Sequence, residues 1–498
     1  MKKFKAKQNY LKITSVSELM AGSADLMPIH THRLNNPVYF VKLFVTFLFF
    51  FSAFFELKAQ GKDSETHHSG FNQNRFDSIE KWSYHFQLTS IGQAHPAFKA
   101  KYSGKNSIQD TAESALSLTA TLFLGRKLWK GASVFFNPEI AGGKGVSYAL
   151  GLAGAANGET FRIGSPAPQL YVARAFFQQH IALKHSGEEY QEADLNQLGN
   201  IIPSSRFTIS AGKFSIADFY DDNAYSHDPR SEFLNWSLMS NGAWDYPANT
   251  RGYTWGVVME LVKPKWAVRV SSVLVPLIAN ASVFDLNITK AHGETVELER
   301  KLKINGHSGC IKLLGFENFS SAPFYSQGVN RIKSGDSSLI PSFNGQKTGP
   351  DYGRMKYGFG ISAWQELTND LGVFARVSWN DGKTATWAFT EIDQSVSLGL
   401  SIKASKIKRP DDVFGIAGVL NGISQEHYNY LNAGGYGFIL GDGKLTNFGN
   451  EMIIESYYKI KIAQSLWATL DYQFVMNPGY NADRGPVHIF ALRGHVEF

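Results

Sequence analysis

Cysteine is almost absent from this chain of 498 residues, because Cys310 is the single one. One thiol cannot form an internal disulfide or supply the several thiolates of a zinc or iron–sulfur site, so both are excluded. Cys310 is therefore interpreted as a small buried apolar residue. Charged residues make up only 18% of the chain and aromatic residues 14%, which is the composition of a folded protein rather than a disordered one.

An excess of positive charge is also missing once the first 59 residues are set aside. The whole chain carries a net charge of +6, but residues 1–59 hold eight of its Lys and Arg and three of its Asp and Glu. The other residues hold 41 basic and 40 acidic side chains. Such a balance offers little to neutralise phosphates, so nucleic acid is disfavoured as a partner.

Long hydrophobic runs are missing apart from one, which excludes a polytopic helical membrane protein. This run spans Leu43 to Phe55 between Lys42 and Glu56. It is too short to span a bilayer core of roughly 30 Å, and it fits the apolar region of a signal peptide. The small residue Ala59 then predicts cleavage after position 59.

The leader leaves two alternatives open: the run could be a single N-terminal anchor helix, and Met20 or Met27 could be the true start. The expected organisation is a leader at 1–59, a periplasmic N-terminal segment at 60–81 and a β-barrel domain at 82–498. We therefore expect an exported protein.

Strand-type alternation recurs after the leader, while long amphipathic helical patterns are nearly absent. In the last segment Phe490, Leu492 and Val496 share one face, and Arg493 and His495 lie on the other. A soluble β-sandwich shows the same alternation as a transmembrane β-barrel, so the length of the segments has to distinguish these two folds. Sixteen segments of mostly about ten residues match outer-membrane strands, against five or six in soluble sheets. The expected strands are 83–94, 115–125, 130–139, 169–183, 206–214, 252–262, 265–274, 294–304, 306–316, 354–366, 370–379, 394–404, 412–422, 451–462, 465–476 and 488–498.

The connections between these strands alternate between long and short, as in outer-membrane barrels. Gaps such as 140–168, 215–251 and 381–393 are long, and Lys263-Pro264 and Asn305 are short turns. Among the connections expected to be short turns, only 184–205 is too long. The fold expected is thus an all-β, antiparallel transmembrane barrel of about 16 strands, wide enough for an aqueous lumen, with external loops folded inwards.

Aromatic residues border many of the segments and are expected to form girdles at the two membrane interfaces. They are Trp82, Tyr84, Trp129, Tyr253, Trp255, Trp266, Trp364, Trp379, Tyr457, Tyr458 and Tyr472. The terminal Phe498 ends an alternating strand and resembles the signature read by the barrel-assembly machinery.

Several stretches of the chain resemble the carbohydrate-selective porin family, which includes glucose-inducible porins of Gram-negative bacteria. The likeness spans essentially residues 60–498. It is carried by IGQAHPAF (91–98), FFNPE (135–139), DFYDDNAYSHDPRSEFLNW (218–236), GAWDYPANTRGYTWG (242–256), TWAFTEIDQSVSLGL (386–400), RPDDVFGIAGVLNGIS (409–424) and NPGYNADRGPVHIFALRGHVEF (477–498).

This resemblance implies a sixteen-stranded outer-membrane barrel that lets mono- and small oligosaccharides diffuse down their gradient without energy coupling. Asn249 departs from the acidic residue expected before Arg251, which puts charge pairing there in doubt. Expected partners are carbohydrate, outer-membrane lipid and the assembly machinery. Self-association into a homo-oligomer is an open alternative to a monomer.

A sugar channel needs hydrogen-bonding groups and aromatic faces at its constriction. Strand parity and the inward-folding loops 140–168 and 215–251 supply the pore-lining candidates, since charges on the lipid face are costly. The candidates are Glu139, Arg162, Arg174, Asp218, Arg230, Trp236, Trp244, Asp245, Arg251, Arg376, Glu455, Asp471 and Arg493. For each, ordinary salt bridging between loop and wall is the alternative to sugar contact.

The enzyme motifs fail, so no catalytic residue and no cofactor are expected. Gly382-Lys383-Thr384 lacks the earlier glycine of a phosphate-binding loop, and Cys310 stands where a nucleophile elbow needs glycine. The acidic residues of 218–228 suggest Ca²⁺ but lack EF-hand spacing. An outer-membrane enzyme acting on lipid and a secreted β-rich sugar-binding protein are the alternative functions.

Overall fold

The computed structural model describes residues 80–160 and 166–498, and these form one closed antiparallel barrel of sixteen strands. The strands are β1 (Trp82–His95), β2 (Glu113–Trp129), β3 (Ala132–Gly143), β4 (Gln169–Ala182), β7 (Arg206–Phe214), β8 (Thr254–Lys263), β9 (Trp266–Val273), β10 (His292–Ile304), β11 (His307–Ser320), β12 (Arg354–Thr368), β13 (Leu371–Asn380), β14 (Gln394–Ala404), β15 (Arg409–Gly422), β16 (Glu451–Ala463), β17 (Leu466–Met476) and β18 (Val487–Glu497). Each strand that the alternation predicts is present. The predicted fold class is confirmed.

Short helices lie in the connections. The α-helices are α2 (Trp236–Met239), α3 (Tyr325–Lys333), α4 (Ile340–Phe343) and α5 (Gln425–Asn432), and the 3-10 turns are η3 (Val146–Ala149), η5 (Ile216–Asp218), η6 (Ser405–Ile407) and η7 (Pro478–Tyr480). Within the described ranges no helix is both long and apolar enough to cross a membrane. The predicted leader, 1–59, lies outside the described residues.

The ring closes where the first strand meets the last. β1 pairs with β18 over eight residue pairs, from Gln87 opposite Glu497 to Ala94 opposite Phe490. All other neighbours in the ring follow chain order except β4 and β7, which pair directly across the inserted segment 183–205. No barrel strand is therefore left with an unpaired edge, which is what hydrocarbon surroundings require.

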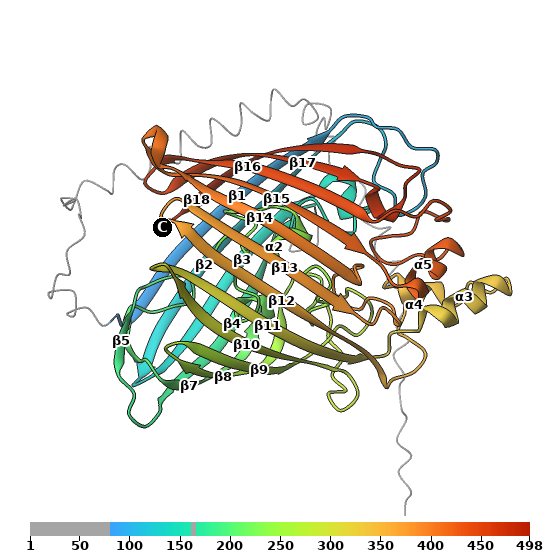
Figure 1. Cartoon of the computed structure of the whole chain (residues 1–498). Helices are drawn as coiled ribbons and strands as arrows, with labels where there is room; N and C mark the ends of the chain where they lie inside the picture. Colours follow the sequence, from blue (N-terminus) through green and yellow to red (C-terminus); the bar gives the residue numbers. More distant parts are fainter. Residues whose placement is uncertain (1–79, 161–165) are drawn as a thin grey trace, which may run out of the picture. The chain divides into compact units, whose positions relative to one another are not determined.

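The two ends of the barrel differ in their connections. Figure 1 shows α3, α4 and α5 gathered at one end, and β5 with the C-terminus at the other. The second end carries tight turns such as Asn305-Gly306, where both residues have positive φ, 51° and 87°. Asn and Gly tolerate this left-handed backbone, so the pair suits a two-residue hairpin. Long loops mark the external end in outer-membrane barrels.

The long gap 184–205 contains a small hairpin of its own. It is formed by β5 (Glu188–Gln191) and β6 (Asn200–Pro203) at the short-turn end. The hairpin packs on the start of the barrel, because Gly199 N–H donates to Glu80 at 2.9 Å and Ser83 donates to the Gln197 carbonyl at 3.3 Å. This insertion explains why the gap is longer than a turn.

The two faces of each strand differ as the alternation predicts. On β17 the Leu470 side chain points outwards and is 59% exposed, whereas its neighbour Asp471 is 5% exposed. On β18 Phe490 and Leu492 are exposed and Arg493 is fully buried. Apolar side chains therefore cover the outer surface, and charged side chains line the inner wall.

Most of the expected girdle residues lie on the outer surface, but three do not. Trp82, Tyr84, Trp129, Trp255 and Trp266 are all exposed. The other three, Tyr253, Trp364 and Tyr457, belong to the interior: Tyr253 and Tyr457 are buried and Trp364 packs edge-on against Tyr225 at 5.8 Å. Their strand parity, or for Tyr253 the contact with Glu139, turns them inwards, so their assignment to a girdle was wrong.

The hydrophobic core lies inside the barrel, between the wall and the loops that fold into it. Phe233 of the 215–253 connection packs against Phe374 of β13 and Tyr457 of β16, with ring centroids 5.5 and 4.9 Å apart. Loops 144–160 and 381–393 contribute further buried residues such as Leu152 and Trp387. Inward folding of 140–168 and 215–251 is thus observed for their described parts, and 381–393 joins them.

The assignment of faces predicts a depth-dependent cost of charge. Leu470→Arg places a cation near the middle of β17 on the lipid side and should reduce the free energy of unfolding by about 2–4 kcal/mol. Met476→Arg, on the same face but at the strand end, should cost about 1 kcal/mol or less. Urea unfolding of the folded protein in lipid vesicles measures both values. An equal cost at the two positions would contradict the assignment.

Candidate functional site

The connection between β7 and β8, residues 215–253, crosses the inside of the barrel, and we call it the crossing segment. Its side chains and backbone bond to inward-facing residues of β4, β10, β13 and β16. These strands belong to different parts of the ring. The crossing segment is therefore held at several points around the wall.

Arg230 joins the crossing segment to the first three strands. Its guanidinium donates to Glu159 at 2.9 Å, to Glu139 at 3.0 Å, to Gln87 at 3.0 Å and to Thr121 at 2.9 Å. Both carboxylates and the guanidinium are buried. A buried cation with two carboxylates is strongly destabilised when one partner is removed, so these contacts fix the loop in position.

Glu139 on β3 also accepts hydrogen bonds from two tyrosines. The Tyr253 hydroxyl donates to Oε1 at 2.9 Å, and the Tyr171 hydroxyl donates to the same oxygen. The two rings lie 6.2 Å apart, centroid to centroid. One carboxylate is thus surrounded by a guanidinium and two phenols.

A second ion pair lies beside this carboxylate. Arg174 of β4 binds both oxygens of Asp218 at 2.6 Å, and its guanidinium is 5.3 Å from the centre of the Tyr253 ring. The guanidinium of Arg251 is 3.9 Å from the centre of the Tyr171 ring. The Asp218 side chain is 27% exposed, so solvent reaches this group. We call these residues the Glu139 cluster: Glu139, Tyr171, Arg174, Asp218, Arg251 and Tyr253.

Arg376 of β13 is a further anchor of the crossing segment. It donates to Asp221 at 2.9 Å and to the backbone carbonyls of Leu238 at 2.8 Å and Ser226 at 2.5 Å. Arg376 and Asp221 are both buried. This arrangement holds two distant parts of the segment against one strand.

Glu455 and Arg493 hold the crossing segment by its backbone. Glu455 accepts the N–H groups of Leu234 and Asn235 at 2.5 and 2.9 Å. Arg493 donates to two backbone carbonyls of the segment at 2.6 and 2.8 Å, and Asp471 lies beside it on the neighbouring strand. The wall charges here satisfy backbone groups that would otherwise be buried without partners.

The two predicted tryptophans are enclosed by protein. Trp236 stacks on Phe389 at 5.2 Å, and Trp244 is almost fully buried. Asp245 accepts the backbone N–H groups of 387–389 at 2.9 to 3.1 Å. Trp236 and Asp245 therefore join the crossing segment to loop 381–393.

Loop 381–393 is an interior element that the sequence analysis did not single out. Its aromatic run TWAF at 386–389, unusual for a solvated loop, is the signal that could have found it. Glu391 of this loop accepts the Leu440 N–H at 2.6 Å, and burial raises the pKa of Glu391 to about 8. Loop 381–393 thus bonds to the crossing segment on one side and to the external connection that contains Leu440 on the other.

The structure describes twelve of the thirteen predicted pore-lining residues, and Arg162 lies outside the described residues. The interactions above place these side chains in two groups. The Glu139 cluster brings Glu139, Arg174, Asp218 and Arg251 together. Of the others, Arg230, Arg376, Glu455 and Arg493 join the crossing segment to the wall, Trp236 and Asp245 join it to loop 381–393, and Trp244 and Asp471 are buried in the interior. Contact of any of them with a sugar stays a prediction.

A row of charges on β8 to β11 escaped the sequence analysis. Arg269 bonds to Glu260 at 2.9 Å, Glu297 at 3.1 Å and Glu299 at 2.7 Å, and Lys312 lies 3.8 Å from Glu299. Strand parity was the available signal, since 297 and 299 alternate with outward residues on β10. The row lies on the inner wall, six strands around the ring from β3 at its β11 end.

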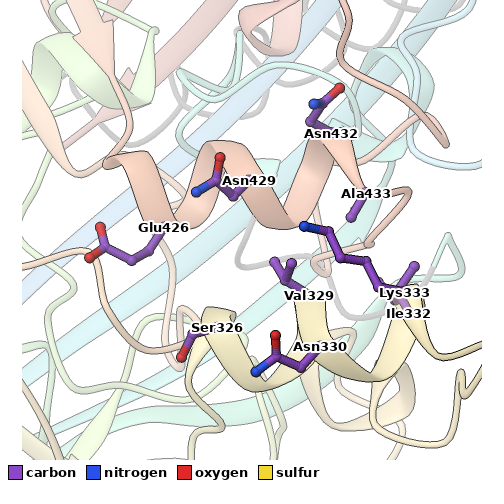
Figure 2. Close-up of a pocket in the computed structure, with 9 residues that line it drawn as sticks. All are labelled: Ser326, Val329, Asn330, Ile332, Lys333, Glu426, Asn429, Asn432 and Ala433. Atoms are coloured by element: carbon purple, nitrogen blue, oxygen red, sulfur yellow. The ribbon is translucent and has the colours of Figure 1, made fainter.

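Outside the barrel wall, a groove of about 560 Å³ lies between α3 and α5, and Figure 2 shows its lining. The groove contains Asn330 and Lys333 of α3 and Glu426 and Asn429 of α5. None of the predicted site residues lines it. Among residues 80–160 and 166–498, no group of three or more His, Cys, Asp or Glu is placed to hold a metal ion.

A closed sixteen-stranded barrel, apolar outside and charged inside, defines the class of the outer-membrane porins. The family model described as the carbohydrate-selective porin, OprB family, matches residues 105–498. The chain belongs to this family. It is therefore a passive channel for carbohydrates in the outer membrane of a Gram-negative bacterium.

A solved structure shares the fold at low identity. The high-pH structure of OprB from Pseudomonas putida is 14% identical, with a TM-score of 0.59 over 84% of this chain and 94% of that one. Its low-pH structure is 13% identical, with a TM-score of 0.43 over 84% and 93%. The outer-membrane channel DcaP of Acinetobacter baumannii is 10% identical, with a TM-score of 0.42 over 84% and 97%. No curated protein matches the chain.

The anchoring of the crossing segment by Arg230 can be tested directly. Arg230→Met removes the guanidinium from two buried carboxylates and should destabilise the inward position of the segment by about 3–5 kcal/mol. We expect faster proteolysis within 215–253 and a higher conductance in salt, with the barrel still folded. Arg331→Met removes a partner of Asp336 in an exposed external pair and should change neither. Equal behaviour of the two variants would refute the anchoring role.

Proposed function

We propose that mono- and small oligosaccharides pass the Glu139 cluster on their way through the barrel. The supporting observation is the composition of this cluster: two carboxylates, two guanidinium groups and two tyrosine rings on β3, β4 and the crossing segment. Sugar hydroxyls both donate and accept hydrogen bonds, and their C–H faces pack on aromatic rings. The cluster offers all three kinds of contact.

Within the cluster, we assign sugar contact to Arg174, Asp218 and Arg251, while the buried Glu139 holds the two tyrosine rings beside them. The bidentate pair of Arg174 with Asp218 is partly solvated, so a hydroxyl can reach it without breaking a fully buried bridge. The remaining predicted residues line the interior by holding the loops in place. Arg162 keeps its predicted role as a pore-lining residue beside them.

Swelling of liposomes in sugar solutions tests this proposal. Vesicles containing the folded protein should swell in glucose and in a disaccharide, and Asp218→Asn should slow glucose-driven swelling by about tenfold, since a charge-assisted hydrogen bond is lost. Glu426→Gln makes the same chemical change on α5, away from the interior, and should leave swelling unchanged. Absence of swelling with the folded wild-type protein would refute sugar passage.

The same vesicles test the absence of catalysis, which we propose together with the channel role. Hydrolysis of the vesicle phospholipid by the folded protein would favour the alternative of an outer-membrane enzyme. We also propose that the assembly machinery reads Phe498, whose backbone pairs with that of Phe86 at the end of the ring. Ultracentrifugation in detergent would distinguish a monomer from a homo-oligomer, the alternative that the sequence leaves open.

We propose that export is followed by cleavage after Ala59. The apolar run that ends at Phe55 and the small residue at 59 support this position. N-terminal sequencing of the protein from outer-membrane fractions should begin at Gln60. A mature chain that retains residues 43–55 would contradict the cleavage and favour an anchor.

A further inference from the structure

A charged side chain of the crossing segment faces solvent deep inside the barrel. Asp222 follows Asp221, which is buried against Arg376 of β13 and Glu297 of β10. Despite this position, the Asp222 side chain is 70% exposed. The solvent that reaches it therefore belongs to the space enclosed by the wall.

The nearest wall cation to this carboxylate is Lys312 of β11. Its Nζ lies 3.8 Å from Asp222 and 3.8 Å from Glu299 of β10. Within the described part of the chain no hydrogen bond joins Nζ to another group. A cation held between two carboxylates at these distances has ammonium protons free for a ligand.

Arg269, another cation of this wall, differs from Lys312. It makes close contacts with three carboxylates, at 2.7 to 3.1 Å, through its Nε and Nη1 donors. Arg269 therefore stabilises the wall, and it also fixes Glu299 beside Lys312. Lys312, whose Nζ lies 3.8 Å from two carboxylates, and the exposed Asp222 are left as the groups that can bond to a ligand.

The charges also indicate that Asp222 is ionised. Desolvation inside the barrel acts to raise the pKa of Asp222, but the nearby His227, Lys312 and Arg269 outweigh it, and the pKa lies below its ordinary value. An ionised carboxylate accepts hydrogen bonds and donates none. It complements the ammonium group, which donates only.

We propose that Asp222 and Lys312 form a second carbohydrate subsite, on the β10 to β11 wall, that binds two neighbouring hydroxyl groups of a sugar. One hydroxyl donates to the Asp222 carboxylate, and the adjacent hydroxyl accepts from Lys312 Nζ. Glu299 and Arg269 position the lysine and do not touch the sugar. This subsite rests on the proposed function, since it serves the same diffusing sugars.

The subsite is distinct from the Glu139 cluster. Asp222 and Asp218 belong to the same crossing segment, but Asp218 bonds to β4 and Asp222 lies against β11, five strands further around the ring. A sugar that leaves one wall therefore meets hydrogen-bonding groups on another. Two weak subsites allow passage without tight capture at either one.

Sugar-induced current noise of the full-length protein in planar bilayers tests the proposal, with glucose as the probe. Asp222→Asn and Lys312→Met should each weaken the apparent glucose affinity by about tenfold, the size expected for one charge-assisted hydrogen bond. The double variant should be little weaker than either single one, because both groups hold the same hydroxyl pair. Lys301→Met is the matched control, on the same face of β10 as Glu299 but exposed near the short-turn end.

The affinities of monodeoxy-glucoses distinguish sugar contact from a purely structural role of Asp222. One of them should bind about tenfold more weakly than glucose to the wild type, yet as well as glucose to Asp222→Asn. The exposed Asp222 position keeps the test decisive even if Lys312→Met fails to fold. Unchanged glucose affinity in Asp222→Asn, with only the salt conductance altered, would overturn the subsite while leaving the channel role intact. Absence of glucose binding to the wild type, together with absence of swelling, would refute the proposed function itself.

Discussion

Pairing of every backbone N–H and C=O group is the constraint on which this structure depends. In hydrocarbon an unpaired backbone group costs several kcal/mol, so a sheet survives there only if its edges meet. The pairing of β1 with β18 closes the ring and leaves no edge, and the insertion 183–205 is placed outside it without interrupting the pairing of β4 with β7. Closure at sixteen strands in turn creates an interior too wide for wall side chains to fill.

The width of this interior explains the charges found in it. Loops that enter the barrel bring backbone groups and polar side chains out of water, and each needs a partner. The wall supplies them: Glu455 accepts backbone N–H groups, while Arg376 and Arg493 donate to backbone carbonyls. Most of the interior charge is therefore used to hold loops, and what remains solvated, at the Glu139 cluster and at Asp222, is available to a passing ligand.

Strand positions and faces could be predicted because alternation with a period of two is a local property of the chain. It placed Arg174, Arg376 and Arg493 on the inner wall. The girdle assignment failed for Trp364 and Tyr457, because it ignored their parity: both lie within strands, on the inward face of β12 and β16. The alternation also left 184–205 unassigned, because a short hairpin outside the barrel has no lipid-facing side and therefore no regular alternation of apolar and polar residues.

The sequence by itself determined the number of strands, which side chains of each strand point outwards or inwards, and the family. These properties follow from local periodicity and from motifs spread along the chain. Only the tertiary structure decided which charges meet. These contacts join segments that are distant in the sequence. Arg230 binds Glu139 and Glu159, loop 381–393 bonds to Asp245, and the solvated Asp222 lies beside Lys312. Such pairings depend on where a loop crosses the ring, and no local pattern encodes that path.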